Sequence, residues 1–394
     1  NTQTRDRQIC TTATIWFIVL HFITFSVNNI FKKNYKTKTM KLFKNIKAAA
    51  TVFLATIILG ANAVQAQGSD DNTILGAGST FVYPLFSKLF SVYNQKTKLE
   101  VNYQSIGSGG GILQLTNKTV DFGDSDAPLT DDQSNKMGAD VLHIPMCAGA
   151  VSITYNLPGI NASLNLTSTV LANIFLGKVK TWNDPSIVAL NKGVSVPAFP
   201  IIIAHRTDGS GTTNIFTHYL SAVSPEWSSK VGSGGAVNWP AGLGGKGSEG
   251  VAGLVKQTPG TIGYVELAYA VQNKMPQAKI QNAKGQFVAP SVASTIAASN
   301  VNLPKDSKAF IVNSPTANAY PIAGFTWALI YKEQNYNNRT AARAQKLVQL
   351  LWWNIHEGQQ YCQPLTYAPL SPAATKTAEA ILRTATYNGK PILK

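Results

Sequence analysis

The chain has 394 residues and a formal net charge of +15, from 34 basic and 19 acidic residues. Nine of the basic residues and one of the acidic residues lie within the first 66 positions, so the remainder carries only about +7. Because the basic residues are scattered and form no arginine-rich run, we expect no nucleic acid among the partners. A moderate positive charge can, however, help to gather anions.

A secretory signal peptide is predicted over residues 40–66. Met40 is the first methionine, and a short basic region leads into the apolar core at residues 48–61 (AAATVFLATIILGA). The small residues of Val-Gln-Ala then precede Gln67, as signal peptidase requires. An anchoring helix is the alternative, but a membrane span needs ~20 apolar residues. We interpret residues 1–39 as an upstream extension outside the fold.

Two cysteines, Cys147 and Cys362, follow the predicted cleavage site. Export implies an oxidising compartment, where such a pair can form a disulfide, and two unrelated buried thiols fit the sequence equally well. No cysteine lies at the cleavage site itself, so we expect a periplasmic protein without a lipid anchor.

In chain order, short apolar strands alternate with helical stretches, which is typical of an α/β sheet. A helix is expected directly after Ser79-Thr80, which we expect to cap it. Further strands and helices follow to the C-terminus. The expected strands are residues 73–75, 101–103, 151–155 and 201–203, and the later helices are residues 341–355 and 373–384.

Two domains are predicted, because the 328 residues from Gln67 onward exceed what one core usually supports. The apolar segment 325–331 follows a Pro/Ala/Asn-rich stretch and is a natural point for the chain to return to the first domain. We therefore expect a discontinuous domain I, residues 67–152 and 324–394, and a domain II, residues 153–323.

Three Gly- and Ser/Thr-rich turns each follow a predicted strand and precede a helical stretch. They are residues 76–80 (GAGST), 107–111 (GSGGG) and 208–213 (DGSGTT). The first turn of a helix has unpaired N–H groups and the positive end of the helix dipole, and glycine lets a ligand approach that backbone. Three such turns predict a site for one small oxyanion, with three unrelated turns as the alternative.

Two charged residues extend this site. Arg206 precedes the third turn and offers a planar fork of donors for tetrahedral oxygens, and Asp208 is expected to hold it in place. Asp126 lies in the segment 122–128 (FGDSDAP). Monohydrogen phosphate can donate its hydrogen to this carboxylate, whereas sulfate at neutral pH has none to give, so Asp126 would reject sulfate. A metal site or a solvated loop is the alternative for that segment alone.

Six segments resemble the periplasmic phosphate-binding proteins of phosphate-specific (Pst-type) ABC transporters, in the same order over essentially the whole chain after the signal peptide. The resemblance implies an α/β, type II periplasmic-binding-protein fold, with two domains joined by a hinge and phosphate held in the cleft between them. The segments are residues 76–81, 102–108, 120–128, 206–212, 242–247 and 260–266.

Carried over position by position, the resemblance implies a phosphate site with donors from both domains. Asp126 would accept the phosphate proton, and Asp208 would pair with Arg206. Two departures are visible: Asp124 stands where a small residue is usual, and 109–111 is Gly-Gly-Gly where a further serine is common. The implied donors are Thr80, Phe81 and Ser108 from domain I, and Arg206, Ser210, Gly211 and Thr212 from domain II.

The resemblance also implies capture of inorganic phosphate by a monomer that needs no cofactor, and its delivery to the membrane permease subunits of an ABC importer. A receptor for another tetrahedral oxyanion, sulfate or molybdate, is the nearer alternative. A phosphatase-type enzyme is the more distant one, because Ser210 is not in a Gly-x-Ser-x-Gly motif and no H-E-x-x-H or C-x-x-C spacing supplies a metal.

Overall fold

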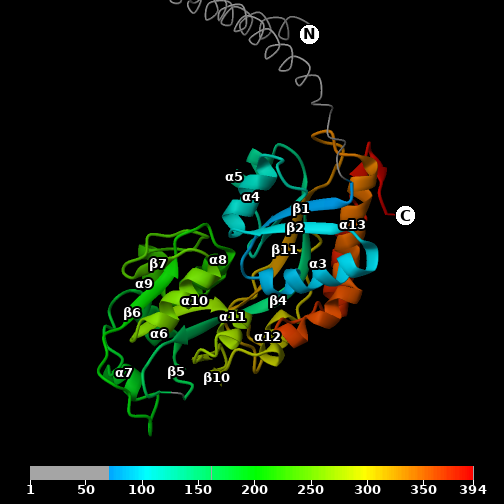
Figure 1. Ribbon diagram of the computed structural model, residues 1–394. Coiled ribbons are helices and arrows are strands. Elements are labelled where there is room, and N and C mark those ends of the chain that lie inside the picture. Colours follow the sequence, from blue (N-terminus) through cyan, green and yellow to red (C-terminus); the bar gives the residue numbers. More distant parts are fainter. Residues whose placement is uncertain (1–70, 161, 394) are drawn as a thin grey trace, which may run out of the picture. The chain divides into compact units, whose positions relative to one another are not determined.

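The computed structural model describes residues 71–160 and 162–393, so the predicted signal peptide and the extension before it lie outside the described residues. A mixed sheet of eight strands, in the order β2-β1-β3-β11-β4-β8-β6-β7, runs through this part of the chain (Figure 1). Its strands are β1 (Thr73–Gly78), β2 (Glu100–Ser105), β3 (Phe122–Ser125), β4 (Val141–Tyr155), β6 (Ile202–Arg206), β7 (Leu243–Gly245), β8 (Thr261–Glu266) and β11 (Ala323–Tyr331).

Strand β4 joins two halves of this sheet. Residues 141–150 of β4 pair with β11, and residues 151–155 pair with β8, both antiparallel. We call β2, β1, β3, β11 and the first part of β4 the first half-sheet, and the rest of β4 with β8, β6 and β7 the second half-sheet. The change of partner lies between Ala150 and Val151, next to the expected domain boundary, which stays a prediction.

Strand β11 lies in the middle of the first half-sheet although it comes late in the chain. It pairs antiparallel with β3 on one side and with β4 on the other. The register with β4 shifts between Thr326 and Trp327, where Pro145 of β4 stands opposite Trp327. A bulge suits this place because proline has no N–H for the ladder, and bulges redirect neighbouring side chains.

Helices pack on both half-sheets, as Figure 1 shows for α3 and α13 beside the first half-sheet and for α8 and α10 beside the second. The helices are α3 (Tyr83–Thr97), α4 (Ser108–Thr116), α5 (Asp131–Met137), α6 (Ser168–Phe175), α7 (Pro185–Val188), α8 (Gly211–Val223), α9 (Pro225–Lys230), α10 (Gly247–Gln257), α11 (Leu267–Gln272), α12 (Val292–Ser299), α13 (Ala341–Ile355) and α14 (Pro372–Leu382). The remaining elements are short. They are the 3-10 helices η1 (Glu357–Tyr361) and η2 (Gln363–Leu365) and the strands β5 (Asn165–Leu166), β9 (Lys279–Gln281), β10 (Phe287–Val288), β12 (Thr386–Tyr387) and β13 (Lys390–Pro391).

The expected strands and helices are confirmed with bounds that differ by a few residues, for example Pro372–Leu382 for the helix expected over 373–384, but the expected cap of the first helix is wrong. Helix α3 starts at Tyr83 after Val82, which makes no side-chain cap, and Pro84 occupies its first turn. The Ser79 hydroxyl instead accepts from the N–H of Phe81 at 2.9 Å, so it fixes the turn before the helix. Two residues of turn therefore separate Ser79-Thr80 from the helix.

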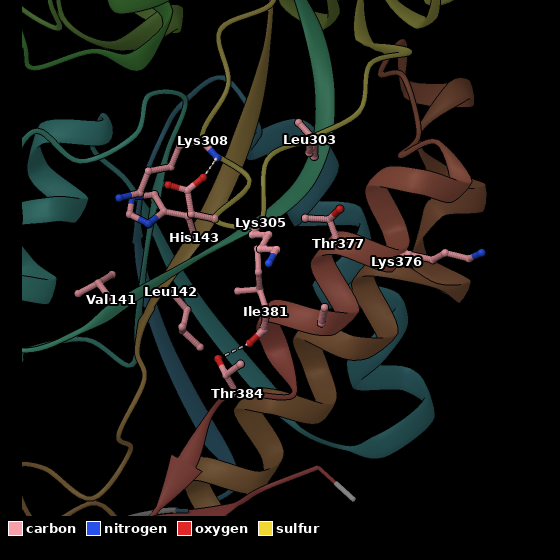
Figure 2. A pocket seen from close by; sticks show the side chains of 12 residues that line it. Val141, Leu142, His143, Leu303, Lys305, Lys308, Lys376, Thr377, Ile381 and Thr384 are labelled. Carbon is pink, nitrogen blue, oxygen red and sulfur yellow. Dashed lines mark hydrogen bonds between the residues drawn. The ribbon is translucent and has the colours of Figure 1, made fainter.

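A pocket of about 580 Å³ lies against the start of β4 and α14, away from the three turns (Figure 2). His143 of β4 lines it together with Lys308 and residues of α14 such as Ile381. Burial and the charge of Lys308 lower the pKa of His143 to about 4, and its Nε2 accepts from the N–H of Leu129 at 3.1 Å. None of the predicted site residues lines this pocket.

Across residues 71–160 and 162–393, no helix has the length and apolar character needed to cross a membrane. Cys147 and Cys362 are both buried free thiols, so the disulfide that the sequence left open is not formed in the structure. Burial raises the pKa of both thiols, which keeps them neutral.

Candidate functional site

The three Gly- and Ser/Thr-rich turns lie at the carboxyl ends of parallel strands. β1 and β2 are parallel, and so are β1 and β3 and, in the second half-sheet, β6 and its neighbours β7 and β8. The turn after β1 holds Thr80, the turn after β2 leads into α4, and the turn after β6 leads into α8. In open α/β sheets this edge is where ligands bind, because strand ends and helix N-termini meet there.

Asp126 is the buried carboxylate at the centre of this edge, directly after β3, and is 1% exposed. Ser79 donates its hydroxyl hydrogen to Asp126 Oδ2 at 2.7 Å. Thr326 Oγ1 of β11 lies 2.8 Å from Asp126 Oδ1. The carboxylate thus has hydroxyl neighbours on both oxygens, which position it rigidly.

The turn after β6 approaches Asp126 from the second half-sheet. A Cβ built on Gly211 would lie 2.5 Å from Asp126 Oδ2 and 2.6 Å from its backbone nitrogen, which is closer than real Cβ atoms come. Only glycine therefore permits this approach. The Ser108 hydroxyl links the same two segments, because it accepts from the N–H of Gly211 at 3.1 Å and from that of Asp126 at 3.3 Å.

Arg206 forms the predicted pair with Asp208 at the end of β6. Its Nε donates to Asp208 Oδ1 at 2.8 Å, and its Nη2 donates to Oδ2. The Tyr264 hydroxyl accepts from the Arg206 backbone N–H at 3.1 Å. Burial opposes ionisation of Asp208, but the hydrogen bond and charge of Arg206 and the N–H of Gly247 lower its pKa below the ordinary value. The pair leaves the other N–H groups of the guanidinium for a ligand.

The predicted hydroxyl donors have different environments. Ser210 caps α8 by accepting from the N–H of Thr213 at 3.0 Å. Thr212 Oγ1 is buried and has no hydrogen-bond partner among the described residues, so it remains a donor for an anion. Thr80 Oγ1 instead contacts Ser248, accepting from its N–H at 3.1 Å.

Thr80 and Phe81 therefore form hydrogen bonds with other groups of the protein and do not point freely into a cleft. The N–H of Phe81 donates to the Ser79 hydroxyl, and Tyr269 donates its hydroxyl hydrogen to the Thr80 carbonyl at 2.6 Å. Thr80 and Tyr269 come from opposite half-sheets, as do Thr80 and Ser248, so the first turn is one of the places where the half-sheets touch. Its predicted donor role stays a prediction.

The electrostatics of the site are dominated by buried carboxyl groups. Burial raises the pKa of Asp126 to about 6, although hydrogen bonds from Ser79 and Thr326 and the charge of Arg206 act against this rise. Burial and the neighbouring Asp126 raise the pKa of Asp124 well above its usual range, and burial does the same for Glu266. A metal site is not supported, since no cluster of His, Cys, Asp or Glu in the described residues could hold an ion.

Several groups of the site were not among the predicted residues. Ser79 and Thr326 contact Asp126, and Ser248 and Tyr264 hold the turns. Ser79 lies inside a predicted turn and could have been found from its spacing. No sequence pattern indicates that Thr326 belongs to the site, because it lies 200 residues from Asp126 within an apolar strand.

Comparisons with known proteins agree with this geometry. A family model described as the PBP superfamily domain matches residues 63–349. The phosphate-binding protein PstS of Xylella fastidiosa (strain 9a5c) is 46% identical over 311 residues, covering 78% of this chain and 84% of that protein. The chain belongs to the PstS family of phosphate-binding proteins. PstS of Pasteurella multocida (strain Pm70) is 42% identical over 317 residues, covering 79% of this chain and 90% of its own length.

Solved structures confirm the expected α/β, type II periplasmic-binding-protein fold. A high-affinity periplasmic phosphate-binding protein bound with phosphate superimposes with a TM-score of 0.62 at 20% identity, covering 78% of this chain and 93% of its own. The phosphate-binding protein of Stenotrophomonas maltophilia gives a TM-score of 0.61 at 19% identity, covering 80% of this chain and 94% of its own. At these identities the likeness establishes the fold.

Proposed function

We propose that this protein binds inorganic phosphate between its two half-sheets and delivers it to an ABC-type phosphate importer. The observation that carries the proposal is a buried carboxylate, Asp126, at the place where turns from both half-sheets meet and within reach of the charge of Arg206. A carboxylate accepts a hydrogen bond and repels a fully deprotonated anion. This combination favours hydrogen phosphate over sulfate.

In this proposal Asp126 accepts the phosphate proton, and the N–H groups and hydroxyls of the turns donate to the other oxygens. Arg206 contributes positive charge, and Asp208 orients it. The donors are the predicted ones: Thr80, Phe81, Ser108, Ser210, Gly211 and Thr212.

The wider role follows from the family. The relatives are named phosphate-binding proteins, and periplasmic members are among the solved structures. We infer that the mature protein is a periplasmic monomer with a domain I of residues 67–152 and 324–394 and a domain II of residues 153–323. Its domains close on phosphate about β4 and the start of β11, and the closed form docks on the membrane permease subunits.

Isothermal titration calorimetry of phosphate-stripped protein with phosphate, arsenate and sulfate tests the ligand. Phosphate and arsenate, which share a protonation state, are expected to bind, and sulfate is expected to bind on the order of 10⁴-fold more weakly, because it leaves the carboxylate unpaired. Asp126→Asn is expected to narrow this difference, since an amide donates to sulfate as well. Equal affinity of the wild-type protein for sulfate and phosphate would overturn the proposal.

A further inference from the structure

Asp124 and Asp126 share one hydroxyl neighbour deep in the protein. Thr326 Oγ1 lies 2.9 Å from Asp124 Oδ1 and 2.8 Å from Asp126 Oδ1. Both carboxyl groups are buried, with 0% and 1% exposure. A hydroxyl has a single hydrogen to donate, and two ionised carboxylates would have to share it at close range. A hydrogen on one of the two carboxyl groups gives both short contacts a donor and removes the repulsion between two buried anions.

The surroundings of the two carboxyl groups differ in a way that places this hydrogen on Asp124. Asp126 receives a second hydrogen bond, from Ser79 to Oδ2 at 2.7 Å, and is attracted by the charge of Arg206. Asp124 Oδ2 has no hydrogen-bond partner among the described residues. Donors and cations stabilise a carboxylate, and their absence around a buried carboxyl group favours its neutral form.

We propose that Asp124 is a positioning residue that stays protonated at neutral pH: it donates its hydrogen to Thr326 Oγ1, which in turn donates to Asp126 and keeps that carboxylate ionised as the acceptor of the phosphate proton. This inference rests on the proposed phosphate site. It explains how two acidic residues can lie side by side in the buried part of the site. An ionised Asp124 would instead drive Asp126 to take up a proton itself and lose its acceptor role.

The placement of Thr326 supports a specific relay. Trp327, the next residue of β11, pairs with Ser125, and Ala328 pairs with Asp124. The register of β11 with β4 shifts between Thr326 and Trp327, because Thr326 pairs with Cys147 and Trp327 with Pro145, so the extra residue of the bulge lies on β4 next to Thr326. The Ser79 hydroxyl accepts a hydrogen bond from a backbone N–H, so its own hydrogen is left to donate to Asp126.

Other ionisable groups face this pair from the surrounding strands. Arg206 of β6 is the cation, and Glu266 of β8 is a further buried acid. Tyr103 of β2 and Cys147 of β4 are close enough for the charges of both aspartates to raise their pKa, after burial as the main cause. Arg206 is already paired with Asp208, so no cation among these described groups remains to offset a second buried anion beside Asp126.

Carbon-13 NMR of aspartate carboxyl groups in the phosphate-free protein tests the protonation directly. One aspartate carboxyl signal is expected to stay in the protonated range up to at least about pH 8, far above the ordinary aspartate value, and to be missing from Asp124→Asn. The inference is overturned if Asp124 is ionised at neutral pH. This measurement needs no phosphate, so it is independent of whether the proposed function holds.

Phosphate titrations over a range of pH test the consequence. Asp124→Asn keeps a donor toward Thr326 and cannot ionise. At neutral pH we expect the variant and the wild-type protein to bind phosphate with the same affinity. At alkaline pH, where Asp124 gives up its proton, we expect the wild-type protein to bind phosphate on the order of tenfold more weakly than the variant. A variant that binds phosphate much more tightly than wild type at every pH would show that Asp124 is an ordinary anion, and would overturn the inference while leaving phosphate binding intact.

Two substitutions of Thr326 separate the relay from simple packing. Thr326→Val removes the hydroxyl and is expected to weaken phosphate binding at neutral pH by roughly tenfold, because Asp126 loses a hydrogen bond to its charged form. Thr326→Ser keeps the hydroxyl and is expected to restore most of the affinity and the pH profile of the wild-type protein. Equal affinities and pH profiles for the two variants would contradict the relay.

Discussion

Asp126 has an environment quite unlike that of an ordinary surface aspartate. Burial raises its pKa from the usual 3.8 to about 6, so the folded protein binds this proton more tightly than the unfolded chain does. The stability that comes from this proton is fully present below about pH 4 and is lost as the pH rises through about 6. The anion-binding role thus carries a cost in stability at neutral pH, as functional groups often do.

Asp126→Asn removes that cost. At about pH 8 the phosphate-free variant is expected to be more stable than the wild-type protein, by up to about 3 kcal/mol, and at about pH 4 the two are expected to converge. Urea denaturation of both proteins at the two pH values measures the difference. A variant that is equally or less stable at the higher pH would show that Asp126 is not strained in the folded protein.

Residues that act through local turns were the part of the site that the sequence could predict. Arg206 and Asp208 are two residues apart and pair as expected, and Ser108 and Gly211 lie in turns with a recognisable pattern. Thr326 could not be predicted, because its role arises from pairing between β11 and β3, far apart in sequence. The function of Ser79 as a support for Asp126 also required the folded structure.

At the scale of elements, the strands and amphipathic helices followed from periodicity, but their order in the sheet did not. Helix α13 begins after Thr340, which caps it, and it buries one apolar face. Both its start and its buried face could therefore be predicted from the sequence. Helix α3 lacks such a cap, and its predicted start was therefore placed too early. Alternating strands and helices indicate an α/β sheet without saying which strand lies beside which.

The N-terminal cap of α8 allows helix stability and anion binding to be separated. Ser210 and Ser371 each accept a backbone N–H at the start of a long helix, α8 and α14 respectively. Replacing either with alanine is expected to lower the free energy of unfolding by about 1 kcal/mol. Only Ser210→Ala is expected to weaken phosphate binding as well, which urea denaturation and calorimetry together measure. Equal phosphate affinity in the two variants would remove Ser210 from the site.

At the scale of the whole described unit, close backbone contacts join the turns of the two half-sheets, in addition to side-chain contacts such as that of Tyr269 with Thr80. The N–H of Gly109 donates to the carbonyl of Gly209 at 2.9 Å, and Gly211 lies against Asp126. The close approach leaves no room for a Cβ at Gly211, so this position tolerates little change.

Gly211→Ala is expected to hold the half-sheets apart, because the added Cβ would lie 2.5 Å from Asp126 Oδ2. Phosphate affinity should fall by on the order of 100-fold, and the decrease in radius of gyration that closure produces on phosphate addition, measured by small-angle X-ray scattering, should be lost. Gly253→Ala in α10 is the matched control, since a Cβ there meets nothing within 4 Å. A Gly211 variant that closes like the control would contradict this role.

The position of β11 also dictates when the protein can finish folding. β3 and β4 are made early, yet the strand between them is supplied only by residues 323–331, after the whole second half-sheet has been synthesised. Until β11 has been synthesised, β3 and β4 therefore lack the strand that lies between them in the folded protein. Such a dependence on distant pairing slows folding. A chain cut off before residue 323 would therefore lack the central strand of its first half-sheet, even though every other strand of that half precedes the cut.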